Sequence, residues 1–292
     1  MKGDRTYKGL FVGLVTLDFV YLATSAPQNN QKIVASDYTV SAGGPATNAA
    51  ATFSYLGNKA TLLGVVGTHP TTEIIKADLA SCKVELTDLA PTTIQVPPVS
   101  SVIITQGTGE RAVVSINAVK TQITSNDIPT DILTRSDIVL IDGHQMAVGN
   151  VIALEAKTKN IPVVIDGGSW KQGFESVLPL VDYAICSANF HPPNCNNSEQ
   201  VFAYLSSFGI PYIAITQGEQ PIQYLSNNKI STLEVPPVKN IVDTLGAGDI
   251  FHGAFCHSIL FQNFSDALAD SALIAADSCQ AFGTRGWMDI KG

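Results

Sequence analysis

The sequence predicts a three-layer α/β fold, in which helices cover both faces of a mainly parallel sheet and a small second sheet is inserted. From residue 137 onward, short apolar runs alternate with helix-sized segments, which is typical of parallel strands buried on both faces. Nearer the start, β-like runs are joined by a polar loop that does not resemble a crossover helix, which predicts the small sheet. A chain of 292 residues with 45% apolar residues can bury a large core.

Composition and charge argue against several classes of function. A net charge of −8 disfavours nucleic acid and anionic membranes as partners, because phosphate-rich surfaces are bound by excess lysine and arginine. The five cysteines are scattered without a Cys-x-x-Cys pair, so neither a disulfide framework nor a zinc site is indicated. The apolar run at residues 10–15 is too short for a signal core, and no run reaches membrane length. We therefore expect a cytoplasmic protein.

The first predicted strand of the main sheet spans residues 10–15, and the chain then leaves its end toward Asp18. Ligands of open α/β sheets gather at the carboxyl ends of the strands. Asp18 is therefore a candidate to accept hydrogen bonds from hydroxyl groups of a ligand. The alternative is an aspartate that only shapes a turn.

A glycine pair opens the first predicted helix. Gly43 and Gly44 lead into residues 45–56, where a proline suits the first helical position. Asn48 lies in the first turn of this helix and is expected to face any ligand that approaches the backbone of the two glycines. Because an amide can both donate to and accept from a hydroxyl group, Asn48 is a second candidate for ligand recognition.

Four β-like runs interrupt the alternation of strands and helices, and the two earliest predict a small separate sheet. The segment 106–110 is polar, contains two glycines and separates two of these runs, which is a hairpin signal. A small sheet carried on an α/β body can close over a ligand and exclude water. The four runs are residues 19–22, 32–40, 99–105 and 111–116.

The rest of the chain supplies the main sheet and its helices. Strands are predicted at residues 60–66, 138–141, 161–165, 183–186 and 212–215, and helices at 71–80, 147–159 and 198–208. An edge hairpin is predicted from residues 222–225 and 229–235, and a last helix from an N-cap at Ser265 to residue 281, closed by Gly283. Polar residues at the strand ends either line a site or serve the fold alone, namely Asp142, His144, Asp166 and Lys171.

The chemistry is expected to centre on Asp-Thr-Leu-Gly-Ala-Gly-Asp at residues 243–249. The glycines let a ligand approach the backbone, and a helix that begins there leaves amide groups without carbonyl partners, which makes an anion site. Asp249 would lie beside it as a carboxylate base. This pairing suits phosphoryl transfer to an alcohol, in which positioning, charge stabilisation and a proton acceptor do most of the catalysis. The alternative is that Asp249 only caps the helix.

Two motifs resemble those of the ribokinase, or PfkB, family of carbohydrate kinases. Residues 243–249 resemble its C-terminal signature, and Gly-Gly-Pro-Ala-Thr-Asn at residues 43–48 resembles its N-terminal element. Leu245 and the Ile-Asp-Gly-His segment at residues 141–144 are similar to the ketohexokinase branch. The resemblance implies one ribokinase-like α/β/α kinase domain over residues 1–292. It also implies that the small sheet is a lid, inserted at about 17–41 and 98–118.

The resemblance also implies roles for the catalytic and sugar-side residues. Asp249 would be the general base, and the amides of Gly246, Ala247 and Gly248 would form the anion hole. Arg111 resembles an arginine that approaches the substrate or the transferred phosphate, the alternative being a surface salt bridge with Glu110. The sugar would be held by Asp18, Gly43, Gly44 and Asn48.

The nucleotide side of the resemblance is less complete. Thr216 and Gly218 match a Thr-x-Gly nucleotide loop, although Pro221 replaces its last glycine. Mg²⁺ would be held by nucleotide phosphates and water, because the family's Asn-x-x-Glu element is not matched and no metal ligand is assigned. Thr244 is expected near the nucleotide and a monovalent cation. Leu245 stands where many members have threonine, which leaves the cation requirement open.

We therefore predict an ATP-dependent sugar kinase with ATP and Mg²⁺ as cofactors and a small sugar as partner. A nucleoside kinase of the same family is one alternative, and a catalytically silent sugar-sensing or scaffold relative is another. A dinucleotide-binding oxidoreductase is disfavoured, because no Gly-x-Gly-x-x-Gly follows the first strand. Apolar residues on the lid predict a homodimer through it, with a monomer as the alternative.

Overall fold

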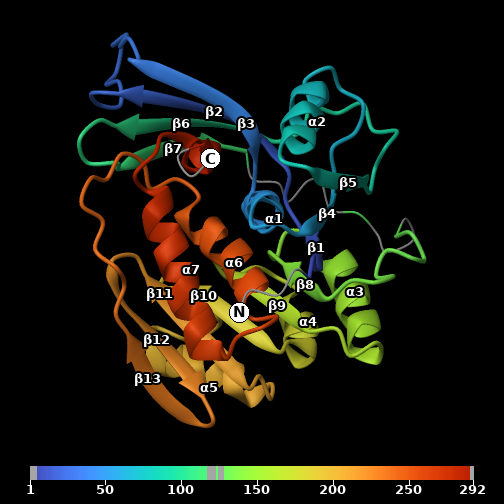
Figure 1. Cartoon of the computed structure of the whole chain (residues 1–292). Coiled ribbons are helices and arrows are strands. Elements are labelled where there is room, and N and C mark those ends of the chain that lie inside the picture. The colour runs from blue at the N-terminus through green and yellow to red at the C-terminus, as the bar shows by residue number, and fades with distance from the viewer. Residues whose placement is uncertain (1–4, 117–122, 124–127, 290–292) are drawn as a thin grey trace.

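The computed structural model describes residues 5–116, 123 and 128–289, and it is built on a nine-stranded sheet (Figure 1). The strand order is β13-β12-β11-β10-β9-β8-β1-β4-β5, and every neighbouring pair from β11 to β5 is parallel. The strands are β1 Lys8–Val12, β4 Lys59–Gly64, β5 Val84–Asp88, β8 Ile138–Ile141, β9 Val163–Gly167, β10 Tyr183–Ser187, β11 Tyr212–Gln217, β12 Gln220–Ser226 and β13 Lys229–Leu233. The last two form the predicted antiparallel edge hairpin.

Helices cover both faces of this sheet and give it two cores. One face carries α1 Pro45–Tyr55, α2 Thr72–Ser81, α6 Ala247–Ser258 and α7 Phe264–Ser278, and the other carries α3 Met146–Thr158, α4 Phe174–Val177 with the 3₁₀ turn Leu178–Leu180, and α5 Ser198–Ser207. Successive residues of each inner strand alternate between the cores: Leu10 and Val12 face the α3 side, whereas Phe11 faces the α1 side. The predicted three-layer α/β class is confirmed.

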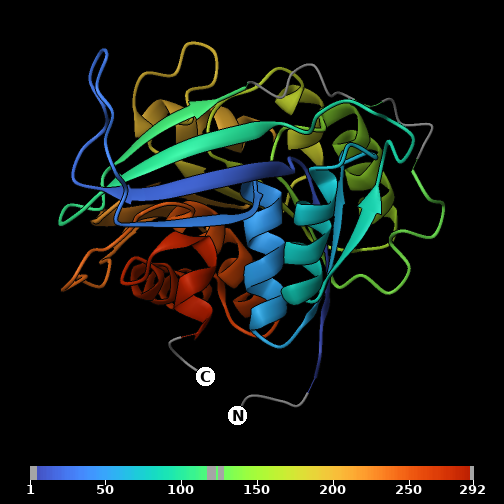
Figure 2. The same cartoon turned by 90° about the horizontal axis from the view of Figure 1, so that it is seen from above.

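The four predicted β-like segments form a separate sheet in the order β3-β2-β6-β7. Its strands are β2 Thr16–Ala23, β3 Asp37–Gly43, β6 Val99–Thr105 and β7 Arg111–Ser115. The small sheet lies at the top of the molecule in Figure 1, and seen from above its strands run across the main body (Figure 2). The inner face buries Val20, Val102 and Ile104 against Leu245 and Phe282. The small sheet therefore lies over the signature loop that leads into α6.

Four sequence-based boundaries are wrong for local reasons. Residues 32–36 form an exposed loop, because pairing with β2 begins only at Asp37 and continues to Gly43. β5 was not predicted, because its short half-polar sequence gives a weak signal. Asn263, not Ser265, caps α7, since its side chain accepts from Asp266 N. Gly283 opens a short further helix, α8 Gly283–Asp289, instead of closing α7. The predicted end of the lid at residues 117–118 lies outside the described residues.

No helix in the described part of the chain has the length and hydrophobicity needed to cross a bilayer.

Candidate active site

The predicted anion site is built around a glycine at the start of α6. Gly246 precedes the helix with φ 72°, a left-handed conformation that side chains disfavour. Ala247 N makes only a long 3.4 Å contact with Thr244 O, and the amides of Gly248 and Asp249 donate to no carbonyl among the described residues. Aided by the helix dipole, these donors can bind negatively charged oxygens.

Asp249, in the first turn of α6, contacts the amide of Asn48. Asn48 Nδ2 donates to Asp249 Oδ2 at 2.8 Å, which joins the two sequence motifs across 201 positions. Asn48 is buried in the first turn of α1, and its Oδ1 accepts from Arg285 Nη1 at 2.8 Å. The residue predicted as the base and the amide predicted to bind sugar thus belong to one hydrogen-bonded cluster.

The surroundings of Asp249 raise its pKa to about 7. Burial has the largest effect, because it removes hydration from the carboxylate, and the nearby charge of Asp166 adds to it. The hydrogen bond from Asn48 and the charge of His252 lower the pKa, whereas Asp142 raises it further. Asp249 as a residue is half-buried, and a carboxyl group of this pKa can exchange protons with a ligand near neutral pH.

Asp18 lies inside β2, so the alternative of a turn aspartate is wrong. Its buried carboxylate accepts from Thr16 Oγ1 at 2.7 Å. Gly43 faces Thr16 across the sheet, and a Cβ atom there would overlap the Asp18 carboxylate. Burial raises the pKa of Asp18, while hydrogen bonds from Thr16 and Ser100 and the charge of Arg285 oppose that rise. The small sheet therefore places the buried Asp18 carboxylate next to the backbone of Gly43, which has no side chain in the way.

Asp142 organises the backbone beside Gly44. Its Oδ2 accepts from Leu14 N at 2.8 Å and Ala46 N at 3.1 Å, and its Oδ1 accepts from His144 N at 2.9 Å. Burial alone would raise the pKa of Asp142, but His144 and the backbone donors outweigh burial and lower it. Gly44 itself has φ 103° and lies against Leu14 O, where a side chain would clash. Asp142 thus holds the first turn of α1 and the glycine pair in place.

His252 and Asp166 form a buried pair behind the anion site. His252 Nδ1 lies 2.7 Å from Gly248 O and 3.4 Å from Asp166 Oδ2, and Nε2 lies 3.0 Å from Ile185 O. Carbonyl oxygens only accept, so both contacts are satisfied when both ring nitrogens carry protons. Burial raises the pKa of Asp166, while His252 has the strongest opposing effect. The imidazole therefore ties the anion-site turn to β10 and offsets acidic charge near Asp249.

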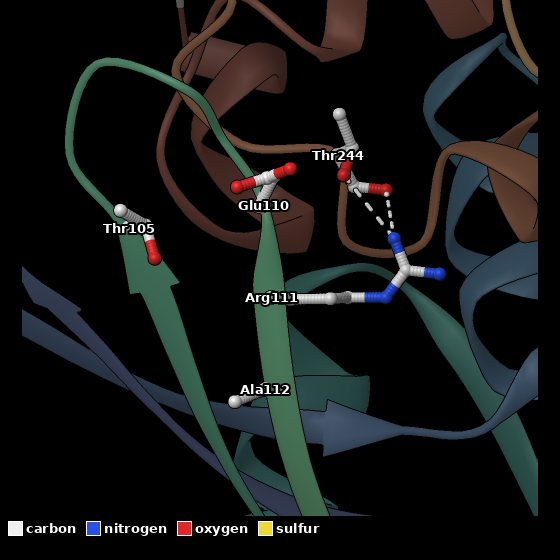
Figure 3. Close-up of a pocket in the computed structure, with 5 residues that line it drawn as sticks. All are labelled: Thr105, Glu110, Arg111, Ala112 and Thr244. Carbon is white, nitrogen blue, oxygen red and sulfur yellow. Dashed lines mark hydrogen bonds between the residues drawn. The ribbon is translucent and has the colours of Figure 1, made fainter. Parts of the chain in front are cut away.

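Arg111, at the start of β7, reaches the signature loop (Figure 3). Its Nη1 donates to Thr244 Oγ1 at 3.1 Å and to Thr244 O at 3.3 Å, while Thr244 Oγ1 donates to Gly109 O at 3.0 Å. These residues border an open pocket, and no salt bridge joins Arg111 to Glu110 in the described structure. The alternative of a surface salt bridge is therefore wrong, and Arg111 links the small sheet to the loop before α6.

The predicted nucleotide loop lies between β11 and β12. Thr216 lies next to the last residue of β11, paired with Ser187 of β10, and its Oγ1 donates to Cys186 O at 3.3 Å. Gly218 has φ 63° in the short turn that follows, and Pro221 lies within β12, between β11 and the edge strand β13. Thr216 and Gly218 thus stand at the carboxyl end of the main sheet, the edge at which ligands of such sheets gather.

Comparison with known proteins identifies the family. The family model described as pfkB family carbohydrate kinase matches residues 8–290. The chain belongs to the pfkB family. It is 22% identical to the ribokinase of Bacillus subtilis (strain 168), over 96% of this chain and 95% of that protein. Ribokinases are also among its similar solved structures, which share its fold.

Two solved structures illustrate that similarity. A putative ribokinase from Agrobacterium tumefaciens has a TM-score of 0.85 at 23% identity, covering 97% of this chain and 94% of that one. Arabidopsis thaliana ribokinase complexed with ribose and ATP has a TM-score of 0.76 at 18% identity, covering 98% and 99%. The expectation of a ribokinase-like fold is confirmed.

Within this pfkB kinase, the structure brings together most residues predicted for the sugar and catalytic side. Asn48 contacts both Asp249 and Arg285 directly. The charge of Arg285 also lowers the pKa of Asp18, against the stronger effect of burial. His252 was missed, although its place three positions after Asp249 puts both on neighbouring parts of one helix face. Arg285 was missed because no motif surrounds it.

Proposed function

We propose that this pfkB kinase transfers a phosphoryl group from ATP to a hydroxyl group of a small sugar. The proposal rests on one observation: Asp249, with a pKa of about 7, lies in the helical turn where the amides of Gly248 and Asp249 donate to no carbonyl group among the described residues. A proton acceptor and an anion site are thereby held in one helical turn. The fold is shared with an Arabidopsis thaliana ribokinase solved with ribose and ATP, which supports the same pair of substrates.

Each group has a defined task in the proposed reaction. Asp249 accepts the proton of the attacking sugar hydroxyl, and the amides of Gly246, Ala247 and Gly248 stabilise the negative charge on the transferred group. On the small-sheet side, Asp18 and Asn48 accept from and donate to sugar hydroxyls. The bare backbone of Gly43 and Gly44 lets the sugar approach.

The nucleotide would enter from the carboxyl end of the main sheet. Thr216, Gly218 and Thr244 are proposed to border it, with Arg111 beside its terminal phosphate. Among the described residues no group of three or more His, Cys, Asp or Glu side chains could hold a metal ion. Mg²⁺ would be held by phosphate oxygens of the nucleotide and by water. Thr244 O, which is expected near a monovalent cation, accepts a hydrogen bond from Arg111. Exchanging K⁺ for Na⁺ in the assay measures whether the reaction needs a particular monovalent cation.

A substrate panel tests the proposal. Purified protein with ATP and Mg²⁺ is offered aldoses, ketoses and nucleosides singly, ADP release is followed, and products are assigned by phosphorus and proton NMR. We expect one class of sugar to accelerate ADP release and to yield a sugar phosphate. If only nucleosides were phosphorylated, the acceptor substrate would be a nucleoside and not a sugar. ADP release that no acceptor stimulates would support a catalytically silent relative instead.

The pKa of Asp249 predicts how the rate depends on pH. A base acts only when ionised, so the single-turnover rate should rise with pH, reach half its maximum near pH 7 and level off above it. Single-turnover conditions prevent product release from hiding the chemical step. A rate that stays constant from pH 8 down to pH 5.5 would contradict a base with this pKa.

The outer face of the small sheet predicts a homodimer. Tyr21 pairs with Tyr38 across β2 and β3, and Val114 lies on the same face two strands away. Tyr38 and Val114 are 69% and 77% exposed, so this face leaves aromatic and aliphatic surface uncovered. Light scattering should give the mass of two chains, and Val114→Glu should give the mass of one. Leu154→Glu, on exposed surface of α3, is the control and should stay dimeric. A monomeric parent protein would refute the dimer.

A further inference from the structure

Arg285, in the short helix α8, joins three distant parts of the chain. Its Nη1 donates to Asn48 Oδ1 in α1 at 2.8 Å, and its Nη2 donates to Ala42 O in β3 at 2.9 Å and to Asp78 Oδ2 in α2 at 3.2 Å. Asp78 Oδ2 also accepts from Ala42 N at 3.1 Å. The guanidinium group is therefore held on one edge by the fold and directed at Asn48 on the other.

The contact with Asn48 decides which end of that amide faces Asp249. A carboxamide has an accepting oxygen and a donating nitrogen, and a guanidinium group can only donate. Arg285 must therefore face the oxygen of Asn48, which leaves Nδ2 to donate to Asp249 Oδ2 at 2.8 Å. If the amide turned over, it would set donor against donor at Arg285 and acceptor against acceptor at Asp249.

The guanidinium group of Arg285 is held through its two Nη groups. Its Nε atom is buried and has no hydrogen-bond partner among the described residues, whereas Nη1 and Nη2 contact Asn48, Ala42 and Asp78.

We propose that Arg285 is a positioning residue for the phosphoryl transfer described above: it fixes the Asn48 carboxamide so that Nδ2 always donates to the Asp249 carboxylate. The inference rests on the proposed function for its catalytic meaning. Its structural content, an Arg285-Asn48-Asp249 relay, is independent of any substrate. The relay keeps one Asp249 oxygen occupied and aims the other at the incoming hydroxyl group.

Charges around the relay act on it from several elements. Asp78 in α2 neutralises the guanidinium group directly, and Asp18 in β2 feels its charge. Around the carboxylate, Asp166 at the end of β9 and Asp142 after β8 oppose ionisation, whereas His252 in α6 favours it. The hydrogen bond from Asn48 also favours ionisation. Loss of the relay should therefore raise the pKa of Asp249.

Carboxyl titration by NMR tests the relay without turnover. The full chain is labelled with ¹³C at aspartate carboxyl groups, and the Asp249 signal is assigned by its loss in Asp249→Asn. Asn48→Ala should raise the Asp249 pKa by about one unit, the effect of one hydrogen bond, and Arg285→Met should raise it in the same direction. Since Arg285 acts through Asn48, the double variant should titrate like Asn48→Ala alone.

A second variant separates positioning from stability. Trp287→Phe changes a buried neighbour in α8 that packs on Tyr55 and donates to Thr284 O, and among the described residues no hydrogen bond joins Trp287 to Asn48. It should lower Tm while the Asp249 pKa stays at the parent value. With an active sugar, Arg285→Met should lower kcat about tenfold and leave KM for ATP unchanged.

Different experimental results would overturn the Arg285-Asn48-Asp249 relay and the proposed function. An Asp249 pKa that is unchanged in Arg285→Met, or a shift that adds in full to that of Asn48→Ala, would overturn the relay. Failure of the parent protein to phosphorylate any acceptor overturns the proposed function instead. The titration result stands in that case, because it needs no substrate.

Discussion

Replacing Asp249 by asparagine should lower kcat about 10²-fold or more while ATP still binds. Asparagine keeps the shape of the side chain and can still contact Asn48, but it cannot take the proton of a hydroxyl group. Asp249→Ala should lose at least as much. Steady-state kinetics with the best sugar gives kcat, and fluorescence titration with a nucleotide analogue gives binding.

The control for Asp249 is Asp266, which occupies the same position in another helix. Asp266 is the third residue of α7, as Asp249 is of α6, and it is exposed to solvent. Asp266→Asn removes a carboxylate near a helix N-terminus without touching the site, so it should leave kcat unchanged and lower stability slightly. If both variants lost only stability, Asp249 would be a helix-capping residue and not the base.

Removing the Asp18 carboxylate should weaken sugar use by about 10- to 100-fold. A substrate hydroxyl left without its buried acceptor costs about 1–3 kcal/mol, and this loss should be seen in kcat/KM for the sugar. KM for ATP should change little. Asn48→Ala should cause a loss of similar size, but because Asn48 also contacts Asp249, part of it should fall on kcat.

The matched control for Asp18 lies in the same small sheet. Asp37, at the exposed start of β3, accepts only from the backbone of Tyr38 among the described residues. Asp37→Ala should therefore keep normal sugar kinetics. An equal rise in KM for ATP and for the sugar in both Asp18→Ala and Asn48→Ala would contradict the proposed division into a sugar half and a nucleotide half.

The fold could be predicted wherever burial leaves a continuous apolar run. β8 Ile138–Ile141 begins and ends at the predicted residues because its apolar run is bounded by Asp137 and Asp142, and β6 Val99–Thr105 ends as predicted where the polar hairpin turn begins. β3 and β5 were misjudged because their extent depends on pairing: β3 continues to Gly43 opposite Thr16, and β5 is an edge strand beside β4. Which residues of a strand pair with a neighbouring strand depends on the tertiary structure, so the local sequence does not show where such a strand ends.

The candidate site divides in the same way. Gly246, Asp249 and Asn48 could be predicted because a helix start with glycines imposes local backbone requirements that the sequence displays. Arg285 and His252 could not, because their partners lie far away in the chain: Arg285 meets Asn48 across 237 positions, and His252 meets Ile185 across 67. A lone arginine near a chain end and a histidine on an apolar helix have no local signature of these contacts.

The position of Arg285 in the chain has a consequence for how the enzyme is made. Translation proceeds from the N-terminus at about 5–20 residues per second, so Arg285 leaves the ribosome seconds after Asp249. Until then a nascent chain contains the strands of both sheets and the carboxylate base, but its Asn48 amide is free to turn. In the proposed relay, catalytic competence is therefore acquired only after Arg285 has been made, later than the carboxylate base itself.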